Sequence, residues 1–192
     1  MRLLLLVLMT LGTTALADIR EEVTHKVAAN GDVELHYVTV GSGPLIVMVH
    51  GFPDFWYSWR HQIEALKDRY TCAALDLRGY NKSGKPEGLE AYDIEVLVAD
   101  IEAVIAAEGQ ESAIVMGHDW GGYISWWLAA FKPERVDKLI ICNLPHPRGI
   151  SRELANNPAQ QQMSAYARLF QTENAHETLS MGMLANMVAQ GD

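Results

Sequence analysis

Runs of consecutive apolar residues recur along the chain and predict buried β-strands. Residues 45–49, 113–116 and 139–142 are apolar throughout, which is typical of strands covered on both faces of a sheet. Residues 70–75 are predicted to be another such strand. Residues 33–40 instead alternate between apolar and polar positions, as expected for a half-buried strand that follows a turn.

Segments with helical periodicity separate these strands. In residues 93–107 the apolar positions follow the i, i+3, i+4, i+7 rule of an amphipathic helix, and helices are also expected over 56–67 and 121–131. Because buried strands alternate with helices, we expect an α/β fold with a mostly parallel sheet and helices on both faces.

The pattern changes after Asn143. Pro145, Pro147 and Gly149 interrupt it, and the remaining sequence favours helix without a further strand. We therefore place a boundary near Pro147. Residues 18–147 are interpreted as the first part of the α/β core, and residues 148–192 as the beginning of a helical lid.

Residues 1–17 have the composition of a secretory signal peptide. Arg2 precedes an apolar stretch, and Ala15-Leu16-Ala17 is a small-x-small cleavage site. The stretch is shorter than the roughly 20 apolar residues of a membrane-spanning helix. We expect cleavage after Ala17, a secreted or periplasmic product, and no membrane span once the signal is removed; an uncleaved anchor is the alternative.

Composition narrows the classes of partner. The net charge of −9 and the lack of any Lys/Arg run disfavour nucleic-acid binding, and 49% hydrophobic residues indicate a packed core rather than disorder. Cys72 and Cys142 lie in predicted strands and are expected to be free thiols. No spacing suggests a metal site or a phosphate-binding glycine loop, so no cofactor is expected. The sequence does not indicate an oligomeric state.

The most informative motif follows the strand at 113–116 and opens the next helix: Gly117-His118-Asp119-Trp120-Gly121-Gly122. Its Gly-x-nucleophile-x-Gly spacing is that of a nucleophile elbow. The turn is so tight that Gly117 and Gly121 are needed to avoid clashing β-carbons, while the central residue is strained and projects from the sheet edge. The alternative is a plain strand–helix turn in which Asp119 caps the helix.

An aspartate at the centre of an elbow selects a particular reaction. Its carboxylate can attack a saturated carbon and form an alkyl ester, whose hydrolysis places negative charge in an oxyanion hole. A second loop, which begins at His50 and includes Phe52, directly follows the strand at 45–49. We expect His50 to belong to this oxyanion loop and the N–H groups of Phe52 and Trp120 to be the donors.

Between Val33 and Gln171 the chain resembles the epoxide hydrolases of the α/β-hydrolase superfamily. The matching segments are 50–60, Asp76-Leu77-Arg78-Gly79-Tyr80, the elbow at 117–122, Pro133-Glu134-Arg135-Val136 and Asn143-Leu144-Pro145-His146-Pro147. One departure is Asn81, where many members of this family have glycine.

The resemblance implies a mechanism for small-molecule epoxides and water. Asp119 would open the epoxide ring, two lid tyrosines would assist at the epoxide oxygen, and a histidine oriented by a carboxylate would activate the hydrolytic water. Tyr166 matches the first lid tyrosine; the alternative is a packing aromatic on a lid helix.

The remaining machinery is expected beyond Asp192. None of the seven histidines has the place of the base, so this chain is interpreted as truncated within the lid and not competent for repeated turnover. Two other functions remain open: a dehalogenase that uses the same aspartate, which Tyr166 and the lack of a side-chain donor at Phe52 disfavour, and a non-catalytic hydrolase fragment.

Overall fold

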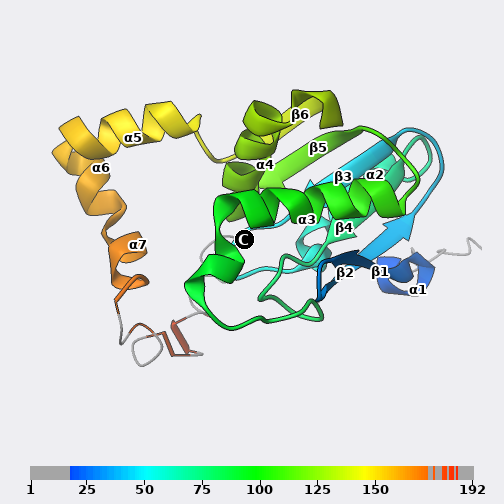
Figure 1. Ribbon diagram of the computed structural model, residues 1–192, viewed down its shortest axis with the longest axis horizontal. Helices are drawn as coiled ribbons and strands as arrows, with labels where there is room; N and C mark the ends of the chain where they lie inside the picture. Colours follow the sequence, from blue (N-terminus) through cyan, green and yellow to red (C-terminus); the bar gives the residue numbers. More distant parts are fainter. Residues whose placement is uncertain (1–17, 173–174, 176–178, 181, 184, 186–192) are drawn as a thin grey trace, which may run out of the picture.

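The computed structural model describes residues 18–172, 175, 179–180, 182–183 and 185. The expected signal peptide at 1–17 lies outside the described residues. Six strands form one mixed sheet in the order β1-β2-β4-β3-β5-β6 (Figure 1). Their bounds are β1 Thr24–Asn30, β2 Val33–Val40, β3 Leu45–Val49, β4 Thr71–Leu75, β5 Ala113–His118 and β6 Val136–Cys142.

The sheet combines an antiparallel hairpin with a parallel half. β1 pairs with β2, and β2 with β4, in antiparallel register, whereas β3 pairs in parallel with β4 and β5, and β5 with β6. The carboxyl ends of β3, β4, β5 and β6 therefore meet at one edge of the sheet, which is where α/β folds place their binding sites.

Helices cover both faces, as expected. The long helices α3 (Ile94–Ala107) and α4 (Trp120–Phe131) pack on one face, while α1 (Ile19–Glu22), the 3-10 turn η1 (Trp56–Trp59) and α2 (Arg60–Leu66) pack on the other. Alternate residues of β3 divide between the two cores: Val47 and Val49 face α3 and α4, and Ile46 and Met48 face η1 and α2. A strand buried on both sides explains its uninterrupted apolar sequence.

The prediction of a half-buried strand at 33–40 is wrong. Five consecutive residues of β2, from Leu35 to Thr39, are buried. β2 is an interior strand because β1, which lacks a strong apolar pattern, pairs along its whole length. The polar side chain of His36 is satisfied there by Asp76 rather than by solvent.

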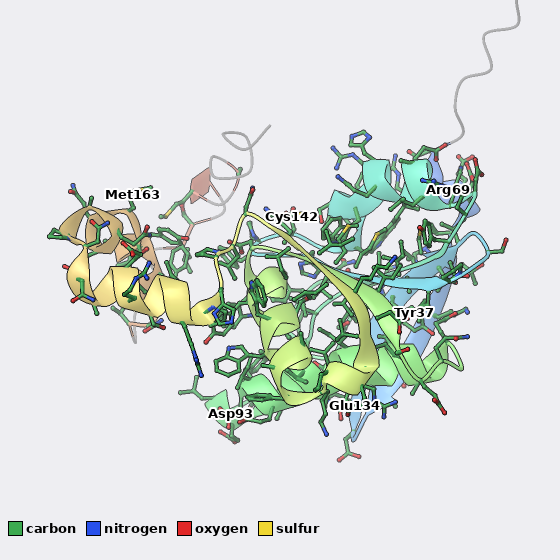
Figure 2. All side chains as sticks on the ribbon, turned by 90° about the horizontal axis from the view of Figure 1, so that it is seen from above. Tyr37, Arg69, Asp93, Glu134, Cys142 and Met163 are labelled. Carbon is green, nitrogen blue, oxygen red and sulfur yellow. The ribbon has the colours of Figure 1, made fainter. Side chains whose placement is uncertain are left out.

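After β6 the chain leaves the sheet and forms three short helices, α5 (Pro147–Asn156), α6 (Pro158–Met163) and α7 (Ala165–Leu169). Figure 1 shows them as an arm beside the carboxyl edge of the sheet, and Figure 2 shows Met163 on this arm, at the opposite end of the molecule from Arg69. None of the residues in α5, α6 and α7 is fully buried.

Two connecting elements are the 3-10 turns η2 (Leu89–Tyr92) and η3 (Pro133–Arg135).

Cys72 and Cys142 are both free thiols. Cys72 is buried, but Cys142 is only partly buried because it ends β6 at the open edge of the sheet. Every helix that the structure describes is too short or too polar to cross a membrane.

Candidate active site

Asp119 stands on a strained turn between β5 and α4. Its backbone has φ 51° and ψ −123°, a region that residues other than glycine seldom occupy. A β-carbon added at Gly117 would lie 2.6 Å from the carbonyl oxygen of Gly121, and one added at Gly121 would lie 2.2 Å from that of Val49. The structure thus has the tight elbow that the glycine spacing predicts.

The carboxylate of Asp119 is held by the loop after β3. The backbone N–H of Phe52 donates to Oδ1 of Asp119 at 3.1 Å. Gly51 allows this approach, since a β-carbon there would lie 2.4 Å from that of Asp119. The arrangement leaves Oδ2 of Asp119 without a hydrogen-bond donor among the described residues, so one oxygen is anchored and the other is available.

Trp120 contributes the first residue of α4. No hydrogen bond joins its N–H to the Asp119 carboxylate in the part of the chain that the structure describes. The residue is 41% exposed, and its indole stacks on the ring of Tyr123 with ring centroids 5.1 Å apart. Of the two expected amide donors, the structure therefore brings Phe52 into contact with the nucleophile and places Trp120 beside it at the start of the helix.

His50 belongs to the oxyanion loop, but its ring does not reach substrate. The side chain is fully buried; Nδ1 donates to the carbonyl oxygen of Gly51 at 2.7 Å, and Nε2 accepts from the N–H of Leu77 at 3.0 Å. Burial lowers the pKa of His50 below its usual value, which favours this neutral form. His50 is therefore a positioning residue that ties the loop after β3 to the end of β4, not a substrate-binding one.

Tyr166 lies on α7 with its side chain 51% exposed. Its ring packs edge-on against Phe170, with centroids 5.6 Å apart, and Phe170 packs against Phe52 at 5.4 Å. An aromatic chain thus connects the predicted lid tyrosine to the loop that holds Asp119. No direct contact between Tyr166 and Asp119 is formed among the described residues.

A cavity of about 860 Å³ opens beside the elbow. Phe52, Trp120 and Tyr80 line it together with Phe55 and Tyr92, so its wall is largely aromatic. A site of this size and character suits a small, mainly apolar molecule. The spacing of the elbow did not reveal Tyr80 and Tyr92, because loops after β4 bring them to the cavity.

A buried carboxylate, Asp76, supports the oxyanion loop from below. It accepts from the N–H of Trp56 at 2.9 Å, from His36 at 2.6 Å and from the amide of Asn81 at 2.8 Å. Burial alone would raise the pKa of Asp76, but these hydrogen bonds outweigh it and hold the pKa below its usual value. The network also accounts for Asn81. Its φ of 40° is one that asparagine tolerates, and its side-chain amide makes a hydrogen bond that glycine could not make.

A second buried carboxylate holds Arg78. The guanidinium of Arg78 pairs with Asp100 on α3, with Nε donating to Oδ2 at 2.6 Å, and both side chains are buried. Asn30 adds a third hydrogen bond to Asp100 at 2.8 Å. This pair fixes the loop after β4 against the helix layer.

No histidine that the structure describes is hydrogen-bonded to Asp119. The one histidine–carboxylate hydrogen bond in the described part of the chain joins His36 to Asp76, within the network below the loop. No group of three or more potential metal ligands is assembled among the residues described. The local geometry is therefore that of a carboxylate on a strained turn, with one oxygen bound by a backbone amide.

Comparison with known proteins agrees with this geometry. Residues 44–187 match the family model described as the alpha/beta hydrolase fold. Epoxide hydrolase 1 of Caenorhabditis elegans is 45% identical over 149 residues, covering 77% of this chain and 37% of that protein. The AB hydrolase superfamily protein YfhM of Bacillus subtilis is 46% identical over 154 residues, or 79% of this chain and 54% of that protein.

A solved structure is also similar. The epoxide hydrolase of Bacillus megaterium in complex with an inhibitor superposes with a TM-score of 0.83 at 43% identity, covering 86% of this chain and 60% of that one. The chain spans between 37% and 54% of the length of the two relatives named above. It belongs to the α/β-hydrolase fold family and is related to the epoxide hydrolases within it.

Proposed function

We propose that the protein opens epoxides to diols through a covalent ester on Asp119. The observation that carries this proposal is the strained elbow that presents Asp119 with Oδ1 bound by the Phe52 amide and Oδ2 free. A carboxylate on an elbow is suited to attack at saturated carbon, whereas a serine would suit acyl transfer. Two of the similar proteins, those of Caenorhabditis elegans and Bacillus megaterium, are epoxide hydrolases, which supports the same chemistry.

In the first step, Oδ2 of Asp119 attacks an epoxide carbon and forms an ester bond while the carbon–oxygen bond of the ring breaks. The departing oxygen gains a proton and becomes a hydroxyl group. Tyr166 is the proposed proton donor, because α7 carries it beside the Phe52 loop through Phe170. An in-line displacement directs the leaving oxygen away from Oδ2 of Asp119, so the proton donor must come from another element than the elbow.

In the second step, water attacks Cγ of the Asp119 ester and negative charge develops on the carbonyl oxygen. Oδ1 already accepts a hydrogen bond from Phe52, so this charge forms where a donor is in place. The N–H of Trp120, at the beginning of α4, is the proposed second donor. Since the described histidines supply no base here, we expect the ester to accumulate on this chain.

Mass spectrometry of the 192-residue chain tests the proposal. Incubation with phenyl glycidyl ether should increase the intact mass by one epoxide, and peptide mapping should place the group on Asp119. The matched variant Asp119→Asn keeps the shape of the side chain but removes the nucleophile, and it should remain unmodified. Absence of an adduct, or an adduct that persists in Asp119→Asn, would reject the proposal.

A parallel incubation with 1-bromohexane distinguishes a dehalogenase. That activity would transfer the alkyl group to Asp119 with release of bromide. Alkylation by the bromide without alkylation by the epoxide would reverse the assignment. Steady diol production by the chain would show instead that a base is present among its residues.

We also propose that the protein is exported and processed after Ala17, on the basis of the signal-like composition of residues 1–17. Expression of the whole sequence in a bacterial host, followed by N-terminal sequencing of the exported product, tests this. A product that begins at Asp18 is expected. A product that retains Met1 in the membrane fraction would favour an anchor.

A further inference from the structure

Tyr80 occupies a fixed position in the wall of the cavity beside Asp119. It lies in a turn after β4. The N–H of Tyr80 donates to the carbonyl oxygen of Leu77, and the N–H of Ser83 donates to the carbonyl oxygen of Tyr80, each at 3.0 Å. Its ring packs edge-on against His50, with centroids 5.0 Å apart. Since His50 is itself buried and held at both ring nitrogens, the tyrosine ring has a rigid support.

The hydroxyl group of Tyr80 is available to donate a hydrogen bond to a bound molecule. Tyr80 and Tyr92 both line the cavity, but the O–H of Tyr92 donates to the carbonyl oxygen of Pro86 at 3.0 Å. No hydrogen bond to the hydroxyl of Tyr80 is formed within the part of the chain that the structure describes. The hydroxyl oxygen is also not one of the fully buried polar atoms without a partner. It is therefore accessible, and because Tyr80 lines the cavity, the hydroxyl is open to the cavity rather than enclosed in the core.

The surroundings keep Tyr80 protonated. Burial raises the pKa of the Tyr80 phenol to about 12, and the negative charge of Asp119 is the second cause of this shift. The hydroxyl therefore remains a donor throughout the neutral range.

This placement decides which part of a substrate the hydroxyl can meet. In the proposed first step the departing ring oxygen is protonated by Tyr166 on α7. Tyr80 belongs to a different part of the chain, the loop after β4, where its ring packs on His50 and lines the cavity together with Phe52. With the departing oxygen assigned to Tyr166, the hydroxyl of Tyr80 is a second donor for another part of the substrate, the substituent of the epoxide.

We infer that Tyr80 is a substrate-binding residue that donates a hydrogen bond to an oxygen in the substituent next to the epoxide ring. The site therefore favours epoxides with an ether or carbonyl oxygen at that position over hydrocarbon analogues of the same shape. Neighbouring aromatic side chains, Phe52, Phe55 and Trp120, supply apolar surface for the rest of the substituent. The inference rests on the proposed function of Asp119.

A matched pair of substrates and a matched pair of variants test the role of Tyr80. Phenyl glycidyl ether has an ether oxygen where 4-phenyl-1,2-epoxybutane has a methylene group. Tyr80→Phe keeps the ring on His50 and removes only the hydroxyl, whereas Tyr92→Phe removes a hydroxyl that already has a protein partner. The rate constant of Asp119 alkylation is measured by intact mass for each combination.

For Tyr80→Phe, the slowing with the ether should exceed the slowing with the hydrocarbon by about two- to tenfold, the effect of one neutral hydrogen bond. Dividing the rate of the unmodified chain by that of the variant, separately for each epoxide, cancels the difference in intrinsic reactivity between the two epoxides. Tyr92→Phe should change both substrates by the same factor. Thermal unfolding of Tyr80→Phe should match that of the unmodified chain, because the lost hydroxyl has no described protein partner.

Two outcomes overturn the inference, and they are distinguishable. If Asp119 is alkylated by both epoxides and Tyr80→Phe slows them equally or not at all, the proposed function stands and Tyr80 is only a packing residue. If the unmodified chain is alkylated by neither epoxide, the proposed function fails and this inference fails with it.

Discussion

Gly51 lies so close to Asp119 that a β-carbon on Gly51 would be 2.4 Å from Cβ and 2.7 Å from Oδ1 of the aspartate. Both atoms belong to the proposed nucleophile, so any side chain at residue 51 must displace Asp119 or move the loop. The N–H of Phe52, one residue further, holds Oδ1 in place. The loop after β3 thus sets the position of the reacting group as closely as the elbow does.

We therefore expect Gly51→Ala to slow alkylation of Asp119 by about 100-fold, the effect of misplacing a reacting group by roughly 1 Å. The control is Gly149→Ala. Gly149 lies in helix α5, and a β-carbon added there would meet no atom within 4 Å. That variant should react like the unmodified chain. A wild-type rate for Gly51→Ala would contradict the close approach.

Tyr166→Phe tests the proposed proton donor on α7. Loss of a positioned acid should slow alkylation by an epoxide by about 100-fold, within the usual range for general acid catalysis. The hydroxyl has no hydrogen bond within the described residues, and the side chain is half exposed, so unfolding should be unaffected. Equal rates for both proteins would identify Tyr166 as a packing aromatic.

Asp100→Asn tests the buried ion pair under the loop after β4. The variant leaves the guanidinium of Arg78 buried without a counter-charge, which should lower the free energy of unfolding by about 3–5 kcal/mol. Urea denaturation followed by circular dichroism gives this value. The control Glu153→Gln breaks an exposed ion pair with Arg152 on α5 and should lower the free energy of unfolding much less. A similar decrease in both variants would contradict the expectation that the buried pair matters more than the exposed one.

The buried ring of His50 predicts a pH dependence of stability. Its pKa is lowered in the folded state, so between the usual value of 6.5 and that lower value only the unfolded chain binds the proton. The contribution is constant above the usual pKa, and stability falls as the pH drops below it.

Urea unfolding at about pH 7.5 and pH 5.5 should therefore show a greater loss of stability for the unmodified chain than for His50→Gln. His25 also has a lowered pKa, but it is present in both proteins and its effect cancels in the comparison. The same loss in both proteins would mean that His50 does not carry the effect.

The strands of the parallel half and the elbow were predictable because each leaves a simple pattern. The exception is the prediction that residues 139–142 are covered on both faces, which is wrong: they belong to the edge strand β6, in which Ile140 is 39% exposed. Strands such as β3 are covered on both faces, so every residue from Leu45 to Val49 is apolar. Parallel pairing places the ends of β3 and β5 at one edge, which brings Phe52 to Asp119 although 67 residues separate them in the sequence.

Features that depend on long-range pairing were harder to predict. β1 has one buried residue, Ala28, and is a strand because β2 pairs with it; without that pairing, β2 was mistaken for a half-buried strand. The ring of His50 was assigned to the oxyanion site because its position in the loop was visible, whereas its bond to Leu77 was not. Tyr80 lies in a turn with no periodicity, so its orientation toward the cavity required the structure.

The arm formed by α5, α6 and α7 has no fully buried residue and meets the body of the molecule through ring contacts, Phe170 on Phe52 and His146 on Trp126. The wall of the cavity, by contrast, is formed by loops that follow β3 and β4 and by the helices α3 and α4. Sequence changes in the arm should therefore cost little in folding, whereas changes in those loops also disturb the core. Within the described chain, the arm is where substitution or fusion is tolerated most readily.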